Sequence, residues 1–143
     1  HVILIAFAVD SPDSLDNVTQ KWIEEVRSIC GKAIPVLLVA CKTDLRNKAL
    51  ANGSFSSDRY IDKATGERVA TSIGARGYFE TSALLSQGVD NLFESATRSA
   101  VLTRDQGHGG VGAAYDRDGN DSKTHGGRRK EKEKDVSKCC VVM

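Results

Sequence analysis

Two short runs of almost entirely apolar residues place the strongest limit on how this chain folds. Residues 2–9 read VILIAFAV and residues 34–40 read IPVLLVA. Such runs, rich in β-branched residues and without alternation of polar and apolar positions, are typical of strands covered on both faces of a parallel sheet. Parallel neighbours need a crossover connection, which is usually a helix. The segment that joins the two runs should therefore be helical.

That joining segment has the pattern of an amphipathic helix. Ser11 can cap its start and Pro12 suits its first position, while Gly31 and Pro35 should end it. Apolar residues recur between these limits at spacings of three and four, which predicts one apolar stripe: Leu15, Val18, Trp22, Val26 and Ile29.

The same alternation continues along the chain. We expect a second strand at about 36–40, an insertion of loop with room for a short helix at 46–64, and a short helix around 66–73. A strand at 78–81 and a final helix at about 89–104 should follow. The final helix carries Leu92, Phe93, Ala96 and Ala100 on one predicted face. Alternating strands and helices predict an α/β fold with a mostly parallel sheet and flanking helices, formed by residues 1–104.

The composition changes after residue 104. Residues 105–143 hold seven glycines, eight Lys or Arg and seven Asp or Glu, with almost no periodic apolar residues. This composition predicts a disordered tail. The net charge of the 143 residues is +1, which argues against nucleic acid as a partner. Met143 is the only methionine, and the chain opens directly on a predicted strand. We therefore expect a piece of a longer protein that lacks its N-terminal part.

Polar side chains follow two of the predicted strands, in ACKTDLR (40–46) and ETSAL (80–84). Ligands of open α/β sheets bind beyond the carboxyl ends of the strands. The Asp44 carboxylate only accepts hydrogen bonds, so it suits guanine, which presents two adjacent N–H donors, better than adenine. Lys42 can lie along a flat base, and backbone N–H groups near Ser82 can donate to the guanine oxygen. Either motif alone also fits a solvated loop, but the two together favour a base-binding site.

The chain resembles the Rho family of Ras-like small GTPases over residues 1–104. The resemblance rests on SPDSL (11–15), CKTDLR, GARGYFETSA (74–83) and GVDNLFE (88–94), and on the place of the insertion. It implies the C-terminal part of a P-loop small-GTPase fold. The family's guanine-binding motifs fall on these positions: Cys41, Lys42, Asp44, Leu45, Ser82, Ala83 and Leu84.

The resemblance also implies cofactors and partners. GTP or GDP with Mg²⁺ would bind the intact protein, a switch in signalling to the cytoskeleton and cell polarity. Effectors, exchange factors, GTPase-activating proteins and a dissociation inhibitor would be its partners. The chain has no GxxxxGK[ST] loop, which phosphate binding requires. We therefore expect no catalytic or metal-binding residue in this chain, and Mg²⁺ ligands only in the missing part. The alternative is a truncated, non-catalytic, lipid-anchored remnant or interaction module.

The last residues predict a lipid anchor. Cys140-Val141-Val142-Met143 matches a C-a-a-X box, and a terminal Met favours farnesylation of Cys140. One lipid chain gives only marginal membrane binding, so Cys139 is a candidate for palmitoylation. Residues 128–138 add six bases and three acids, which form either a weak basic patch or a solvated charge run. The predicted location is the cytoplasmic face of a membrane, the plasma membrane, with a cytosolic pool.

Overall fold

A computed structural model describes residues 1–107, with side chains to residue 103, and its centre is a sheet of three parallel strands. The strands lie in the order β1-β2-β3, with β1 at Ile3–Ala8, β2 at Val36–Cys41 and β3 at Gly77–Glu80. Ile3 pairs with Val36, and Leu37 pairs with Gly77. The predicted parallel sheet with helical crossovers is confirmed.

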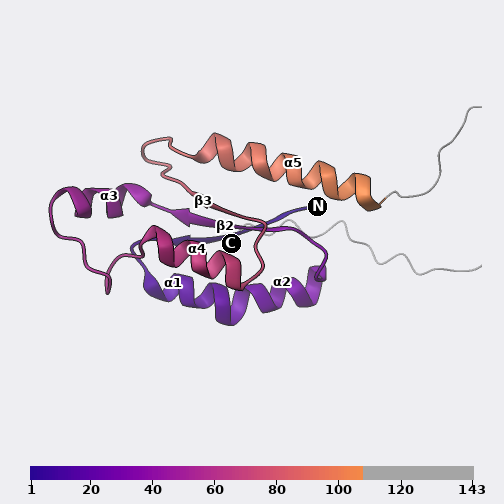
Figure 1. Cartoon of the computed structure of the whole chain (residues 1–143), viewed down its shortest axis with the longest axis horizontal. Helices are drawn as coiled ribbons and strands as arrows, with labels where there is room; N and C mark the ends of the chain where they lie inside the picture. The colour runs from indigo at the N-terminus through magenta and orange to yellow at the C-terminus, as the bar shows by residue number, and fades with distance from the viewer. Residues whose placement is uncertain (108–143) are drawn as a thin grey trace, which may run out of the picture.

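Helices cover both faces of this sheet. The helical elements in the described part of the chain are α1 (Pro12–Asn17), the π turn η1 (Val18–Trp22), α2 (Ile23–Cys30), α3 (Thr43–Ala51), α4 (Lys63–Ser72) and α5 (Val89–Gly107). Figure 1 shows α1, α2 and α4 on one face and α5 on the other, with α3 beyond the end towards which the strands point. Among the described residues, none of these helices is long and apolar enough to span a membrane.

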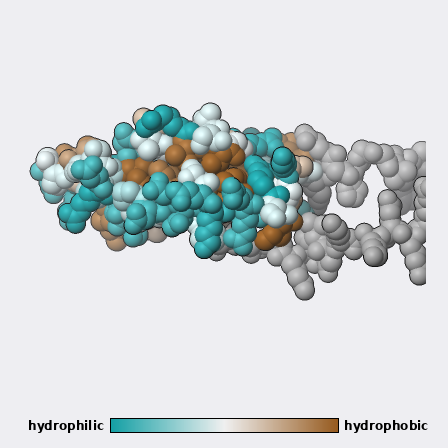
Figure 2. Space-filling model, turned by 90° about the horizontal axis from the view of Figure 1, so that it is seen from below, coloured by the Kyte–Doolittle hydropathy of each residue, from teal (hydrophilic) through white to brown (hydrophobic). Residues whose placement is uncertain are grey.

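The core has two parts, one on each face of the sheet. Alternate residues of β1 and β2 pack with α1, α2 and α4 into the larger part: Ile3, Ile5, Phe7, Val9, Leu15, Val18, Val26, Val36, Leu38, Ala40, Ile61 and Ala70. The smaller part joins Leu37 and Val39 to Leu92 and Ala96 of α5. Seen from the side of α1, α2 and α4, the surface is mostly hydrophilic, with hydrophobic residues gathered in the middle (Figure 2).

The strands differ in how fully they are covered. Val36–Ala40 of β2 is buried on both faces, as predicted. In β1, by contrast, only alternate residues are buried, and Leu4 and Ala6 on the α5 side are half-buried. The prediction of full coverage is wrong for this strand within the described residues, because the buried cluster on the α5 side takes its strand residues, Leu37 and Val39, from β2.

The first crossover differs from the prediction in its stripe. Ile29 is 67% exposed, although Leu15, Val18 and Val26 are buried. The π turn adds a residue to one turn of the helix, so Ile23 and Cys30 pack against the core in place of Ile29. Ser11 occupies the N-cap position as predicted but makes no side-chain cap bond.

Three other boundaries also differ. Helix α3 begins at Thr43 and occupies the start of the predicted loop at 46–64. Helix α4 begins at Lys63 because the Asp62 side chain caps it, accepting a 2.6 Å bond from the Thr65 N–H. Helix α5 runs to Gly107, past the predicted end at 104, and Phe93 on its predicted inner face is 57% exposed. Residues 108–143 of the predicted tail lie outside the described residues.

Candidate functional site

The carboxyl ends of the three strands meet at one edge of the sheet, where each is followed by a polar side chain. Asp10 follows β1, Lys42 and Asp44 follow β2, and Ser82 follows β3. Since all three strands are parallel, these side chains converge although they are far apart in sequence. This edge is therefore the candidate site.

An abrupt change from strand to helix places Lys42 and Asp44. Lys42 has left-handed backbone angles (φ 61°, ψ 35°) and is the N-cap of α3. A non-glycine residue rarely adopts this conformation, and it is concentrated at functional sites. Thr43 fixes the turn, since its backbone N–H and its hydroxyl each donate a 3.2 Å bond to the Thr81 carbonyl. Asp44 lies in the first turn of α3, where the helix dipole favours a carboxylate.

A short hydrogen bond joins the motif after β2 to the motif after β3. The hydroxyl of Ser82 donates to Asp44 Oδ1 over 2.6 Å, and Ser82 is fully buried. The same hydroxyl accepts a 3.2 Å bond from the Leu85 N–H. Paired backbone bonds between Ser82 and Gln87 close the loop, and Ser86 within it has a φ of 53°. Ser82 therefore holds both its own loop and the Asp44 carboxylate.

The Lys42 ammonium turns towards the end of the first strand. Its Nζ lies 3.4 Å from both carboxylate oxygens of Asp10. The side chains are 57% and 29% exposed, so this is an accessible ion pair. The stem of Lys42 thus crosses from β2 towards β1 at the edge of the sheet.

The other predicted site residues lie around these contacts. Cys41 ends β2, is half-buried, and accepts a 3.8 Å contact from the Thr81 hydroxyl at its sulfur. Leu45 is half-buried in the first turn of α3. Ala83 is exposed, and Leu84 is 79% exposed in the loop after Ser82. The structure thus brings Lys42, Asp44 and Ser82 to one edge and leaves Ala83 and Leu84 on its rim.

A largely buried ion pair also joins the same two motifs. The two terminal nitrogens of Arg46 donate to the two carboxylate oxygens of Glu80 over 2.8 and 2.7 Å. Arg46 also donates to the Ile61 carbonyl over 3.4 Å, and the Tyr78 hydroxyl donates to Glu80 over 2.9 Å. The Arg46 side chain is 7% exposed and that of Glu80 23%.

The ionisation of these three groups follows from their contacts. The hydrogen bond to Glu80 raises the pKa of Arg46 against the effect of burial. Burial alone would raise the pKa of Glu80, but the bonds from Arg46 and Tyr78 and the Arg46 charge together lower it. Burial, with the Glu80 charge, raises the pKa of the Tyr78 hydroxyl well above its usual value. The network therefore holds a charged pair beside a neutral phenol.

A glycine allows the loop after β3 to pass close to the strand. Gly88 has a φ of 73°, and a Cβ on it would overlap the carbonyl oxygen of Glu80. Its own carbonyl accepts from the Leu92 N–H in the first turn of α5. The absence of a side chain here keeps Ser82 and the start of α5 close together.

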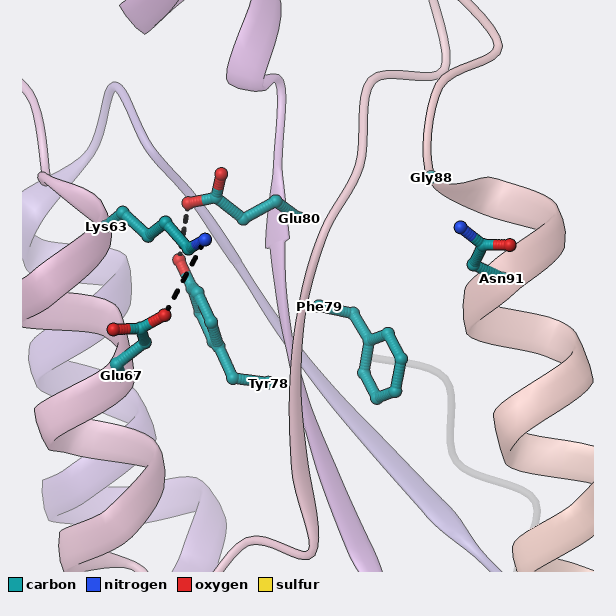
Figure 3. Close-up of a pocket in the computed structure, with 7 residues that line it drawn as sticks. All are labelled: Lys63, Glu67, Tyr78, Phe79, Glu80, Gly88 and Asn91. Atoms are coloured by element: carbon teal, nitrogen blue, oxygen red, sulfur yellow. Dashed lines mark hydrogen bonds and ion pairs between the residues drawn. The ribbon is translucent and has the colours of Figure 1, made fainter.

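A pocket of about 330 Å³ lies on the outer side of β3. Figure 3 shows Tyr78 pointing from β3 towards α4 and Phe79 towards α5, with the Lys63–Glu67 pair on α4 and Asn91 on α5 at the sides. The lining charges are paired, since Lys63 lies 3.7 Å from Glu67 and Glu80 binds Arg46. The predicted site residues do not line this pocket.

Sequence reasoning missed Asp10, Arg46 and Glu80. Asp10 directly follows the first predicted strand, so the rule that selected Asp44 could have found it as well. Arg46 and Glu80 stand within the two quoted motifs, but their pairing depends on burial, which the motifs do not reveal. Within residues 1–103, no group of three His, Cys, Asp or Glu side chains could hold a metal ion.

The site can bind a flat, polar ring. The Asp44 carboxylate accepts hydrogen bonds, the Lys42 stem offers an apolar surface that ends in a cation, and backbone groups surround both. These groups are suited to hydrogen bonding and stacking.

Comparison with known proteins finds a match to the Ras family and relatives among Rho GTP-binding proteins. The sequence profile described as the Ras family matches residues 1–102. The GTP-binding protein rho1 of Schizosaccharomyces pombe is 54% identical over 104 residues, 71% of this chain and 51% of rho1. The GTP-binding protein rho2 of the same yeast is 38% identical over 144 aligned residues, 99% of this chain and 60% of rho2. The GTP-binding protein RHO1 of Saccharomyces cerevisiae is 36% identical over 145 aligned residues, 100% of this chain and 61% of RHO1. The chain thus spans between half and two thirds of the length of these relatives.

Proposed function

Since the chain belongs to the Rho family of Ras-like small GTPases, we propose that the intact protein is a signalling switch that binds GTP and GDP and hydrolyses GTP. The observation that carries the proposal is the contact of Ser82 with Asp44, which joins the two motifs at one edge of the sheet. In this proposal the edge binds guanine, and the phosphates and Mg²⁺ are held by residues outside this chain.

Each residue of the site has a role in the proposal. Asp44 accepts hydrogen bonds from the ring N–H and the exocyclic amine of guanine. Lys42 lies along one face of the base with its ammonium at Asp10, and Ser82 fixes Asp44. Ala83, Leu84, Cys41 and Leu45 complete the wall around the base. The Asp44 acceptor fits guanine because guanine offers it N–H donors, whereas adenine would place a ring acceptor against the carboxylate and leave it unpaired.

The test exchanges the acceptor for a donor. Asp44→Asn in the full-length protein should shift preference from GDP towards XDP, because the second carbonyl of xanthine can accept from the new amide. Competition binding with GDP and XDP measures the shift. Asp90→Asn is the matched control, since Asp90 also lies in the first turn of a helix and should leave the preference unchanged. Unchanged selectivity in Asp44→Asn would refute the role of Asp44.

The proposal includes a membrane anchor on the tail. Cys140 would carry a prenyl group and Cys139 a palmitoyl group, at the cytoplasmic face of the plasma membrane, with a cytosolic pool. Both cysteines lie outside the described residues, so the support is the C-a-a-X sequence. Cys140→Ser should move the protein from membrane to cytosol in a fractionation experiment. Persistent membrane binding would refute this anchor.

The partners in the proposal are those of a regulated switch: effectors, exchange factors, GTPase-activating proteins and a dissociation inhibitor. Family membership supports this list as a class. A pull-down with the full-length protein loaded in turn with GDP and a non-hydrolysable GTP analogue tests it. Effectors should bind the second form more tightly, and equal binding of all partners to both forms would contradict a switch.

A further inference from the structure

The ion pair between Arg46 and Glu80 connects the two guanine-binding motifs in a symmetrical way. Arg46 comes two residues after Asp44, and Glu80 comes two residues before Ser82. The pair is bidentate, with bonds of 2.8 and 2.7 Å, and both members are largely buried. A planar guanidinium bound at both ends to a carboxylate has little freedom to rotate. The pair therefore fixes orientation as well as distance.

Together with two other contacts, the pair forms three links between the same segments. The first is the pair of bonds from Thr43 to the Thr81 carbonyl, and the second is the bond from Ser82 to Asp44. The Thr43 link has two donors but only one acceptor, the Thr81 carbonyl, and the Ser82 link is a single bond. Only Arg46–Glu80 is a bidentate contact between side chains, so it resists twisting of α3 against the end of β3.

The same arginine connects the site to the loop before α4. Arg46 donates to the Ile61 carbonyl over 3.4 Å, and the Ile61 N–H donates to the Val9 carbonyl over 2.9 Å. Val9 stands immediately before Asp10, the partner of Lys42. Arg46 thus contacts the end of β3 directly, through Glu80, and the end of β1 through Ile61.

We propose that Arg46 and Glu80 are positioning residues that set the selectivity of the site for guanine over bases that lack its exocyclic amine. This inference rests on the proposed function and deepens it. Asp44 can accept from two N–H groups only if its carboxylate lies in the plane of the base. A rotation of α3 by a small angle keeps one of those bonds and loses the other.

The experiment compares GDP with IDP, whose hypoxanthine base keeps the ring N–H and lacks the amine. In the full-length wild type, GDP should bind roughly 10 to 150 times more tightly than IDP, the range for one hydrogen bond to a charged group. Arg46→Lys keeps the charge but not the bidentate contact, and Glu80→Gln keeps the shape but not the charge. Each should lower the GDP-to-IDP affinity ratio by roughly tenfold, chiefly through weaker GDP binding.

The chain offers a matched control on α5. Arg98 and Glu94 form a pair at 2.8 Å, but their side chains are 71% and 68% exposed. Arg98→Lys and Glu94→Gln should leave the ratio unchanged. Circular dichroism of every variant identifies any that fail to fold, and the two variants of the buried pair perturb it in different ways.

The outcomes separate the two proposals. A wild type that prefers neither GDP over ADP nor GDP over IDP would refute the proposed function and this inference with it. A wild type selective for GDP, with variants that lose GDP and IDP affinity by the same factor, would overturn this inference alone. In that case Arg46 and Glu80 would only stabilise the fold. A fall in the ratio confined to the buried pair would support the positioning role.

Discussion

Replacing Gly88 by alanine tests the close packing that brings the loop after β3 to its place. The new Cβ would overlap the backbone carbonyl of Glu80 and lie 3.3 Å from its carbonyl carbon. A backbone atom cannot rotate away as a side chain can, so either β3 or the loop must move. The substitution also imposes a φ of 73° on an L-residue.

Two costs add up in this variant. A left-handed conformation costs an L-residue about 1–2 kcal/mol. Overpacking against a fixed neighbour adds about 1–3 kcal/mol, so the free energy of unfolding should fall by roughly 2–5 kcal/mol. Gly53 and Gly74 provide matched controls, since each has a φ of 66° and a Cβ on either would meet nothing within 4 Å. Alanine at these positions should carry only the first cost.

Urea denaturation of the full-length protein, followed by the fluorescence of Trp22, measures these differences. Trp22 is the only tryptophan in the printed sequence and packs against the larger core. Nucleotide and Mg²⁺ are kept at the same concentration for every variant, because a ligand of the native state raises apparent stability. If Gly88→Ala destabilises no more than Gly74→Ala, the close approach of the loop to Glu80 is refuted.

Three further changes have expected outcomes in the same assay. The raised pKa of Tyr78 means that the folded protein holds the phenol proton more tightly than the unfolded chain. Stability should therefore fall as the pH rises above about 10, by at most about 1.4 kcal/mol per pH unit. Tyr78→Phe should flatten this decline, and an unchanged slope would contradict the raised pKa of Tyr78 that burial and the Glu80 charge cause. Ser82→Ala should lower the free energy of unfolding by roughly 1.5–3 kcal/mol, because the bond from a buried hydroxyl to a carboxylate is lost. A loss below about 0.5 kcal/mol would show that the bond is not formed. Asp10→Asn should change the free energy of unfolding by less than about 1 kcal/mol, since its partner Lys42 is mostly exposed. A larger loss would show that the ion pair stabilises the fold.

Much of the fold could be predicted because apolar runs and helical stripes indicate which segments form strands and helices. Residues 36–40 appeared as a continuous apolar run, and this strand is buried on both faces. The π turn could not be predicted, because a straight helical period places Ile29 inward equally well. The predicted inward position of Phe93 was wrong for a similar reason. Phe93 is adjacent to Leu92, and one position along a helix turns a side chain by about 100°. Only packing decides which of the two faces the sheet.

The meeting of Asp44 and Ser82 at the candidate site could be predicted from the sequence. The backbone of Lys42 and the Arg46–Glu80 ion pair that hold the site in place could not. The position of Asp44 and Ser82 after consecutive strands was enough to expect them at one edge, and they are in contact. The left-handed backbone of Lys42 has no signal in the sequence, since lysine is not a residue that favours it. The brace between Arg46 and Glu80 required knowing that both side chains are buried. Charged residues are usually exposed, so pattern reasoning assigned neither of them a role.

The parallel register has a consequence for the order of folding. Ile3 pairs with Val36, 33 positions along the chain, and Leu37 pairs with Gly77, 40 positions along. The entropy of closing these two loops differs by only about 0.2 kcal/mol, since it grows with the logarithm of loop length. The entropy of loop closure therefore does not decide which of the two strand pairings forms first. Whichever forms first leaves one edge of β2, the most fully buried strand, open to pairing with other chains. The third strand must therefore be added quickly if aggregation is to be avoided.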